Sequence, residues 1–179
     1  MDIRCAVVAY PSISQKDYDW IQKIRAQHDI YYRLVKPHFT VVFRSSTKQA
    51  EFVQHVKGQA SAIKKFAFVL RCALVVEDVA GDINQVFLVP DKGFSDVVKL
   101  HGRLYTGILA PELRLDIPFY PHISIGHFRD PLNGKRLADE LNGQAFSVEG
   151  TVGNLDIVSI VATNKEIDAV MTIERIALR

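Results

Sequence analysis

The chain contains little cysteine, which removes two common ways of stabilising a small protein. Cys5 and Cys72 are the only cysteines among 179 residues, and both lie within apolar segments. A free thiol in such a segment usually packs as a small hydrophobic side chain. Two isolated cysteines therefore predict neither a disulfide framework nor a zinc site.

Long hydrophobic runs are also lacking. The run from Phe66 to Val76 is interrupted by Arg71 and falls short of the roughly 20 apolar residues that cross a bilayer. The N-terminus enters a strand-like run at once, without the charged, apolar and small-residue succession of a signal peptide. We therefore expect a cytoplasmic protein that has no membrane partner.

The chain has little excess charge of either sign. Its formal net charge is only +2, whereas broad nucleic-acid binding normally requires a clustered basic face. Any contact with nucleic acid is therefore expected to be local. The chain also has no glycine-rich phosphate loop, nucleophile elbow or Walker motif. Its composition, 48% hydrophobic and 23% charged, is that of an ordinary globular domain with a sizeable core.

Strand and helix patterns alternate along the first half of the chain. Short apolar runs rich in β-branched residues indicate strands, and apolar residues at helical spacing indicate helices. The predicted elements are a strand over 3–9, a helix opened by Ser14, a strand over 38–43 after Pro37, a helix capped by Ser46 or Thr47, and a strand over 66–76.

The same order of elements restarts in the second half, after a predicted turn at Gly81-Asp82. A second turn, at Asn164-Lys165, is expected to return the last strand as a hairpin. The predicted elements are a strand over 85–89, a helix over 94–105, a strand from Tyr120, a helix near 135–141 after Asp130-Pro131, and strands over 146–152, 155–161 and 169–178.

The two halves also match in sequence. His122 follows His38 by 84 residues (122 − 38), and Pro37-His38-Phe39-Thr40-Val41 matches Pro121-His122-Ile123-Ser124-Ile125. Alternation alone arises by chance in mixed chains, but matched pentapeptides at a fixed period indicate a duplication. We predict an α+β fold, a single two-lobed domain over 1–179, with β-α-β-α-β repeats at about 1–80 and 81–179 and pseudo-twofold symmetry around a central cleft.

The matched pentapeptides place a histidine beside a hydroxyl twice. Residues two apart in a strand point to the same face, so His38 lies with Thr40, and His122 lies with Ser124. Near neutral pH one imidazole can act as a general base and the other as a general acid. The hydroxyls can hold phosphate oxygens between them. The pattern predicts metal-free opening of a cyclic phosphodiester.

Two other interpretations of the histidines remain open. An isolated histidine in a strand is more often a satisfied polar residue of the core, although the repeat argues against that here. Histidine is also a common metal ligand, but no Cys, Asp or Glu stands at a suitable offset on either predicted strand. We therefore expect neither a metal ion nor a cofactor.

The paired His-x-[Ser/Thr] motifs, each preceded by proline and followed by an apolar residue, resemble those of the two-histidine phosphoesterase superfamily. That superfamily includes RNA 2',5'-ligase-like proteins and 2',3'-cyclic nucleotide phosphodiesterases, and the resemblance covers essentially the whole chain. It implies that His38 and His122 are catalytic, with His122 as the base, and that Thr40 and Ser124 bind phosphate.

The resemblance implies hydrolysis of 2',3'-cyclic phosphates of nucleotides or RNA ends. Related 2',5'-linked or ADP-ribose cyclic phosphate substrates fit as well, and ligation of RNA ends is the reverse type of activity. The alternative from another class is a module that binds a nucleotide or RNA end without turnover. A histidine-ligated metal hydrolase is a third possibility.

Further residues near the motifs are candidate substrate-binding groups. Arg44 shares the parity of Thr40, whereas Arg129 reaches the same face only if the strand carries a one-residue bulge, for which Gly126 is suited. The alternative for both arginines is a surface charge at a strand end, and the role of His127 is equally open.

Aromatic residues precede both motifs and could stack on a base or pack in the core. Tyr120 is the candidate that we retain for substrate binding, and the others are Tyr31, Tyr32 and Phe119. Loops over 44–48, 78–84 and 108–119 are expected to form the rim of the cleft.

Overall fold

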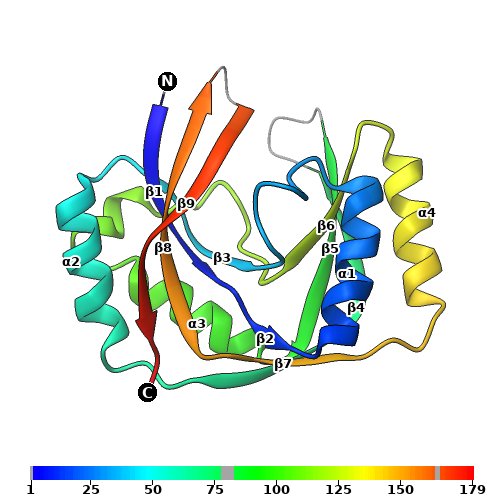
Figure 1. Cartoon of the computed structure of the whole chain (residues 1–179), viewed down its shortest axis with the longest axis horizontal. Coiled ribbons are helices and arrows are strands. Elements are labelled where there is room, and N and C mark those ends of the chain that lie inside the picture. The colour runs from blue at the N-terminus through cyan, green and yellow to red at the C-terminus, as the bar shows by residue number, and fades with distance from the viewer. Residues whose placement is uncertain (1, 78–82, 164–165) are drawn as a thin grey trace.

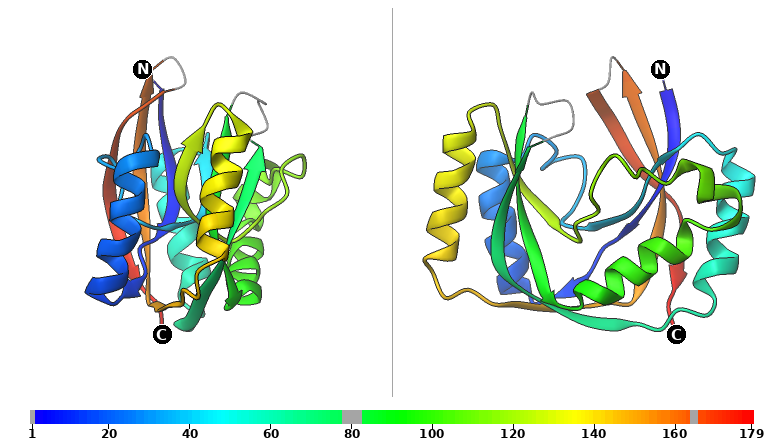
Figure 2. Two further views of the ribbon diagram at one scale, coloured as in Figure 1. Left: turned by 90° about the vertical axis from the view of Figure 1, so that its right-hand side faces the viewer. Right: turned by 180° about the vertical axis from the view of Figure 1, so that it is seen from behind.

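The computed structural model describes residues 2–77, 83–163 and 166–179. Two curved antiparallel sheets face each other, and helices cover the outer side of each sheet (Figure 1). The same arrangement is visible from the side and from behind (Figure 2). The predicted two-lobed α+β architecture is thereby confirmed. Among the helices of the described residues, none is long and apolar enough to cross a membrane.

The first sheet has four strands in the order β3-β1-β8-β9. Strands β1 and β3 come from the first half of the chain, and β8 and β9 from the second. Helix α3 packs on β3, and helix α2 contacts β1, β9 and α3. The bounds are β1 (Asp2–Ala9), β3 (Phe39–Ser45), β8 (Asn154–Thr163), β9 (Glu166–Ala177), α2 (Gln49–Ala60) and α3 (Phe94–Leu104).

The second sheet has five strands in the order β2-β7-β4-β5-β6. Helix α1 packs on β6, and α4 packs on β4, β5 and β6. Both sheets therefore combine strands from the two halves of the chain. The bounds are β2 (Ser12–Ile13), β4 (Phe66–Glu77), β5 (Asn84–Lys92), β6 (Ile123–Phe128), β7 (Val148–Val152), α1 (Gln15–His28) and α4 (Pro131–Asn142).

Aromatic packing joins the two sheets below the cleft. Phe39 on β3 meets Phe68 on β4 with ring centroids 5.1 Å apart, and each side chain is only 1% exposed. Burying one such side chain contributes about 1.5–3 kcal/mol. Ile123, at the start of β6, is likewise fully buried. Because side chains alternate along a strand, burial of Phe39 and Ile123 turns the residues on either side of each toward the cleft.

The helix starts differ in how well the sequence predicted them. Ser14 caps α1, its hydroxyl accepting a hydrogen bond from the Asp17 amide at 3.1 Å. Asp130 caps α4 in the same way, with Pro131 in the first turn. Both features are ordinary start signals that require no tertiary contact.

The predicted cap of α2 is wrong. Lys48 occupies the cap position, and no side chain accepts a hydrogen bond from the first turn. The hydroxyls of Ser46 and Thr47 instead donate to Glu112 Oε1, at 2.8 and 3.1 Å. Glu112 belongs to the 3₁₀ helix Gly107–Glu112, which is remote in sequence. A hydrogen bond from a hydroxyl to its charged carboxylate is stronger than one between the hydroxyl and a neutral backbone amide of α2.

Several boundaries also differ from the prediction. Strands β3 and β6 begin one residue after the histidines, so His38 and His122 precede their strands instead of lying within them. Strand β2 and the 3₁₀ helix were not predicted, since a two-residue strand and a six-residue 3₁₀ helix are too short to leave a periodic pattern. The predicted turns at Gly81-Asp82 and Asn164-Lys165, and part of the 78–84 loop, lie outside the described residues.

Candidate active site

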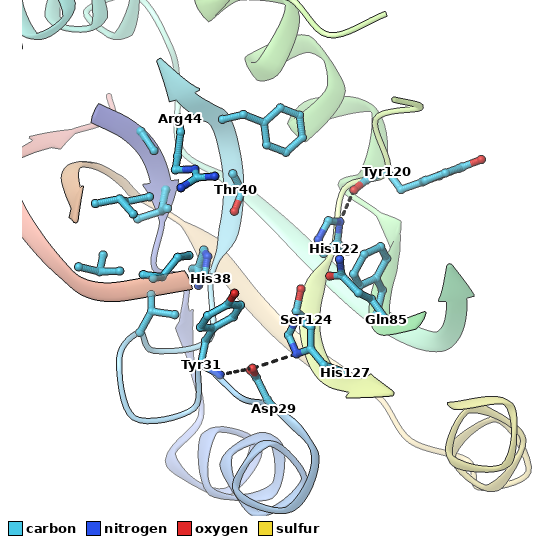
Figure 3. Close-up of a pocket in the computed structure, with 18 of the residues that line it drawn as sticks. Asp29, Tyr31, His38, Thr40, Arg44, Gln85, Tyr120, His122, Ser124 and His127 are labelled. Atoms are coloured by element: carbon cyan, nitrogen blue, oxygen red, sulfur yellow. Dashed lines mark hydrogen bonds and ion pairs between the residues drawn. The ribbon is translucent and has the colours of Figure 1, made fainter. Parts of the chain in front are cut away.

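A cleft of about 520 Å³ lies between the two sheets. His38 and Thr40 line it from the β3 side, and His122 and Ser124 line it from the β6 side. Figure 3 shows the two pairs across the opening, each histidine next to its hydroxyl. The structure thus brings together the four residues that the two motifs singled out.

Both histidines are held by the same local contact. His38 Nδ1 is 2.7 Å from the carbonyl oxygen of Lys36, and His122 Nδ1 is 2.5 Å from that of Tyr120. In each case a proline separates the histidine from the carbonyl that it contacts. A carbonyl can only accept, so Nδ1 carries the proton and Nε2 is left with a free lone pair. Both imidazoles are therefore oriented for proton transfer at Nε2.

Burial shifts the protonation of both imidazoles. Burial lowers the pKa of His38 to about 4 against the opposing effect of the Lys36 carbonyl, while Arg25 lowers and Asp29 raises it. Burial likewise lowers the pKa of His122 to about 4, and His38 and His127 lower it further. In the empty cleft at pH 7 both rings are neutral. A bound phosphate anion would favour a proton on one of them.

The aromatic surroundings of the two histidines differ. His122 stacks on Phe87, with centroids 3.5 Å apart and planes at 13°. His38 meets the edge of Tyr10, with centroids 5.9 Å apart and planes at 63°. The His122 ring is therefore restrained by a flat partner, whereas the His38 ring is restrained from one edge.

The two hydroxyls are available to a ligand. Thr40 and Ser124 lie between buried neighbours and face the cleft. Within the part of the chain that the structure describes, neither hydroxyl has a hydrogen-bond partner. A hydroxyl can both donate and accept. The pair can therefore hold the non-bridging oxygens of a phosphate that lies between Nε2 of one histidine and Nε2 of the other.

Strand β6 carries a bulge that resets its register. Phe87 pairs with Ser124, but the next residue of β5, Val86, pairs with Gly126, so Ile125 is inserted. The bulge lies at Ile125–Gly126, beside the glycine that the sequence indicated. Its consequence is that two successive positions facing the cleft on β6 are Ser124 and His127.

Arg129, which was grouped with Arg44 as a candidate, does not line the cleft. Strand β6 ends at Phe128, and Arg129 is exposed in the bend before α4. The bulge gives positions 127 and 129 the parity of the cleft face, as expected, but only His127 lies within the strand. Arg44 does line the cleft and is exposed at its mouth, and so does Tyr120, 39% exposed.

Asp29 is a functional candidate that the sequence did not reveal. It follows α1 and is bound by Arg25 through an Nε–Oδ2 contact of 2.7 Å, with both side chains 2% exposed. Its other oxygen, Oδ1, accepts from the Tyr31 amide at 2.8 Å and lies 3.2 Å from His127 Nδ1. Burial raises the pKa of Asp29, but His127, Arg25 and the backbone contact outweigh it and hold the pKa below its usual value.

No local signal marks Asp29, because an acidic residue after a helix is ordinary in sequence. Gln85 and Phe87 were missed for a similar reason, since they belong to a strand that was predicted without reference to the cleft. Of the aromatic candidates, Tyr31 and Phe119 line the cleft and Tyr32 does not. Arg4 and Arg114 also line it.

The two walls of the cleft have different chemistry. The wall formed by the four-stranded sheet carries mainly aliphatic side chains next to Thr40. The wall formed by the five-stranded sheet carries aromatic, amide and imidazole side chains. Over residues 2–77, 83–163 and 166–179, no three His, Cys, Asp or Glu side chains cluster closely enough to hold a metal ion. The aliphatic residues are Ala6, Val8, Val158, Ile160 and Val170, and the facing residues include Gln85, Phe87 and His127.

Comparison with known proteins identifies the family of the chain. Residues 11–164 match the model of the 2'-5' RNA ligase superfamily, and the chain therefore belongs to this family of two-histidine phosphoesterases. No curated protein sequence matches the chain significantly.

Solved structures share the fold over nearly the whole chain. TT0787 of Thermus thermophilus is 16% identical with a TM-score of 0.64, covering 98% of each chain. LigT of E. coli is 16% identical with a TM-score of 0.57, covering 99% of each chain. Usb1 of Kluyveromyces marxianus is 11% identical with a TM-score of 0.53, covering 95% of this chain and 96% of its own. At these identities the likeness concerns the fold alone.

Proposed function

We propose that the protein is a metal-independent phosphodiesterase that opens 2',3'-cyclic phosphates of nucleotides or RNA ends by acid–base catalysis. One observation carries this proposal. The Nε2 atoms of His38 and His122, each oriented by a backbone carbonyl at Nδ1, share a cleft with the hydroxyls of Thr40 and Ser124, which have no hydrogen-bond partner among the residues that the structure describes.

The reaction needs one proton removed and one supplied. The base takes a proton from water, and the water oxygen attacks phosphorus in line with the ribose oxygen that leaves. As the ring P–O bond breaks, the acid protonates that oxygen, and the product is a phosphate monoester. Thr40 and Ser124 would hold the non-bridging oxygens and stabilise the charge that accumulates on them.

We assign His122 as the base and His38 as the acid because the family resemblance implies it. The assignment does not rest on the nearby charges, since Arg25 lowers the pKa of His38 more than Asp29 raises it, and His38 and His127 lower the pKa of His122. A bound phosphate would favour the protonated form of His38. The neutral His122, restrained by Phe87, would accept a proton from water.

Nucleotide binding by similar folds supports the substrate class. Structures of E. coli LigT are described as complexes with 3'-AMP, NADP+ and phosphate, at 15%, 17% and 17% identity to this chain. Two of these ligands are nucleotides, and the third is phosphate, the charged group that both nucleotides contain. A cleft lined by arginines, aromatic rings and hydroxyls suits the same class here.

The test is hydrolysis of a panel of 2',3'-cyclic nucleotides, with a chelator present, by the protein and by His38→Ala and His122→Ala. Turnover by the unmodified protein alone is expected. Loss of turnover on adding chelator would replace the proposal with a metal hydrolase. Binding of a nucleotide without turnover would replace it with a binding module.

A further inference from the structure

A third histidine shares the cleft wall with Ser124. His127 lines the cleft, and its side chain is 9% exposed. Because of the bulge in β6, Ser124 and His127 stand opposite Phe87 and Gln85, which are two residues apart on β5 and face the same side. Same-face neighbours on a strand are separated by about 7 Å. His127 is therefore one step along the wall from the hydroxyl that would hold the reacting phosphate.

The orientation of His127 is determined by a buried charge. Its Nδ1 is buried 3.2 Å from Asp29 Oδ1 and, among the described residues, has no aligned hydrogen-bond partner. Figure 3 shows Asp29 between His127 and the backbone of Tyr31. With Nδ1 turned to Asp29, the ring edge that carries Nε2 faces the other way. An imidazole of this kind presents Nε2 to the cleft.

Asp29 is itself fixed by contacts on its other sides. Arg25 donates a hydrogen bond from Nε to Asp29. Its other two nitrogens donate to the Gln22 side chain and to the Val35 carbonyl, each at 2.8 Å. One buried arginine and one backbone amide thus keep the carboxylate ionised. When both of its nitrogens carry protons, an imidazole whose Nδ1–H points at this carboxylate can donate Nε2–H to an anion in the cleft.

We propose that His127 forms a second phosphate subsite, distinct from the site of reaction between His38 and His122. It would hold a non-reacting phosphate of the substrate. The preferred substrates would then be cyclic phosphates that carry another phosphate, as a nucleotide end does. This proposal rests on the proposed function only for the identity of the reacting group.

Other ionisable groups also line the cleft. They include His38, His122, Asp29 and Glu77. The contribution of His127 therefore has to be separated from theirs. Substitution of His127 by arginine does this, because arginine keeps a positive charge and hydrogen-bond donors at the same position throughout the accessible pH range.

The first experiment compares a nucleoside 2',3'-cyclic phosphate with the same compound carrying a 5'-phosphate. The protein is expected to favour the phosphorylated substrate about tenfold in kcat/KM at pH 6, the effect of one added charged hydrogen bond. His127→Gln should lose the preference, and His127→Arg should keep it. Arg129→Gln, a matched loss of a cation outside the cleft, should leave it unchanged.

The second experiment does not depend on turnover. Binding of adenosine 3',5'-bisphosphate and of 3'-AMP is measured by calorimetry at pH 6. The bisphosphate is expected to bind about tenfold more tightly than 3'-AMP to the unmodified protein and to His127→Arg, and to lose that advantage in His127→Gln. Equal affinities in the unmodified protein, or an unchanged preference in His127→Gln, would overturn the subsite.

The two experiments separate the two proposals. Tighter bisphosphate binding that requires His127, without hydrolysis of any cyclic phosphate, would leave the subsite standing and remove the proposed function. Hydrolysis that is indifferent to the second phosphate would do the reverse. If His127→Gln fails to fold, the ratio of bisphosphate affinity to 3'-AMP affinity in the unmodified protein and in His127→Arg still decides the matter.

Discussion

The two walls of the cleft carry nearly the same motif in different surroundings. The His38 wall is aliphatic and has its histidine against the edge of Tyr10, whereas the His122 wall is ring-lined and has its histidine flat on Phe87. The charges that act on His38 are Arg25 and, more weakly, Asp29, whereas His38 and His127 act on His122. A duplicated motif therefore does not give a symmetric site. The surroundings of each copy can assign it a separate role.

The largest expected difference between the two walls is seen when each histidine is removed in turn. His38→Ala and His122→Ala should each lower kcat on a cyclic nucleotide by about 10²–10⁴-fold, the usual contribution of a general acid or base. On a nitrophenyl phosphodiester, whose leaving group needs no proton, His38→Ala should recover most of its rate. His122→Ala should not. Equal losses of both variants on both substrates would contradict the assignment of acid and base.

The buried pair behind His127 should matter far more for stability than an exposed one. Asp29→Asn removes the charge that neutralises Arg25 and should lower the free energy of unfolding by about 3–5 kcal/mol. Asp91→Asn, which breaks the exposed pair with Arg71, should leave the urea midpoint unchanged within error. Similar midpoints for the two variants would mean that Asp29 is not the neutralising partner.

Lowering the pH should destabilise the fold through protonation of His38 and His122. The folded pKa of His38 and of His122 is about 4, below the usual value of about 6.5. Between these values the unfolded chain binds protons that the folded chain does not, so stability present above pH 6.5 is lost as the pH falls toward 4. Asp29, whose pKa is lowered, acts in the same direction at lower pH.

Urea unfolding at pH 7, 6, 5 and 4 measures this loss. The double variant His38→Gln, His122→Gln should show a shallower dependence over the same range, because neither replacement titrates. An unchanged dependence would mean that the acid sensitivity arises elsewhere.

The packing at the bulge in β6 can be tested by substituting Gly126. A Cβ at position 126 would lie 2.7 Å from Phe128 Cε2 and 3.1 Å from His28 Cβ, so Gly126→Ala should cost about 1–3 kcal/mol. Gly102→Ala in α3 meets no atom within 4 Å and should stabilise the helix by about 1 kcal/mol. Thermal unfolding of both variants distinguishes opposite signs, and an unchanged midpoint for Gly126→Ala would mean that the packing there is loose.

The smallest expected effect concerns the arginines that the sequence grouped together. Arg44→Gln should raise KM for a cyclic nucleotide a few-fold and reduce its salt dependence, since Arg44 lines the mouth of the cleft. Arg129→Gln should change neither quantity. Equal effects of the two variants would show that the cleft extends beyond the end of β6.

Much of the fold was predictable because its signals are local. The caps of α1 and α4 and most strands follow from side-chain types and their spacing, without tertiary contacts. Prediction was wrong where a distant group intervened. Ser46 and Thr47 bind Glu112 instead of capping α2, and no pattern within the loop indicates that a carboxylate will arrive there.

The candidate site divides in the same way. Parity along a strand was enough to place a hydroxyl beside each histidine, but parity fails after a bulge. The sequence indicated a bulge at Gly126 and its effect on the parity of Arg129, but not that β6 ends at Phe128, which leaves His127 in the cleft and Arg129 outside it. Register is a property of two paired strands, and one strand's sequence specifies it only in part.

By itself, the sequence determined the two Pro-His-x-hydroxyl motifs, the alternation of strands and helices, and the family that these resemble. These are local features, because periodicity and turn chemistry act over a few residues. Only the tertiary structure decided that each sheet combines both halves of the chain, that Asp29 stands behind His127, and that the two walls differ. Those outcomes depend on contacts between segments far apart in the chain, which are selected by the packing of the whole core.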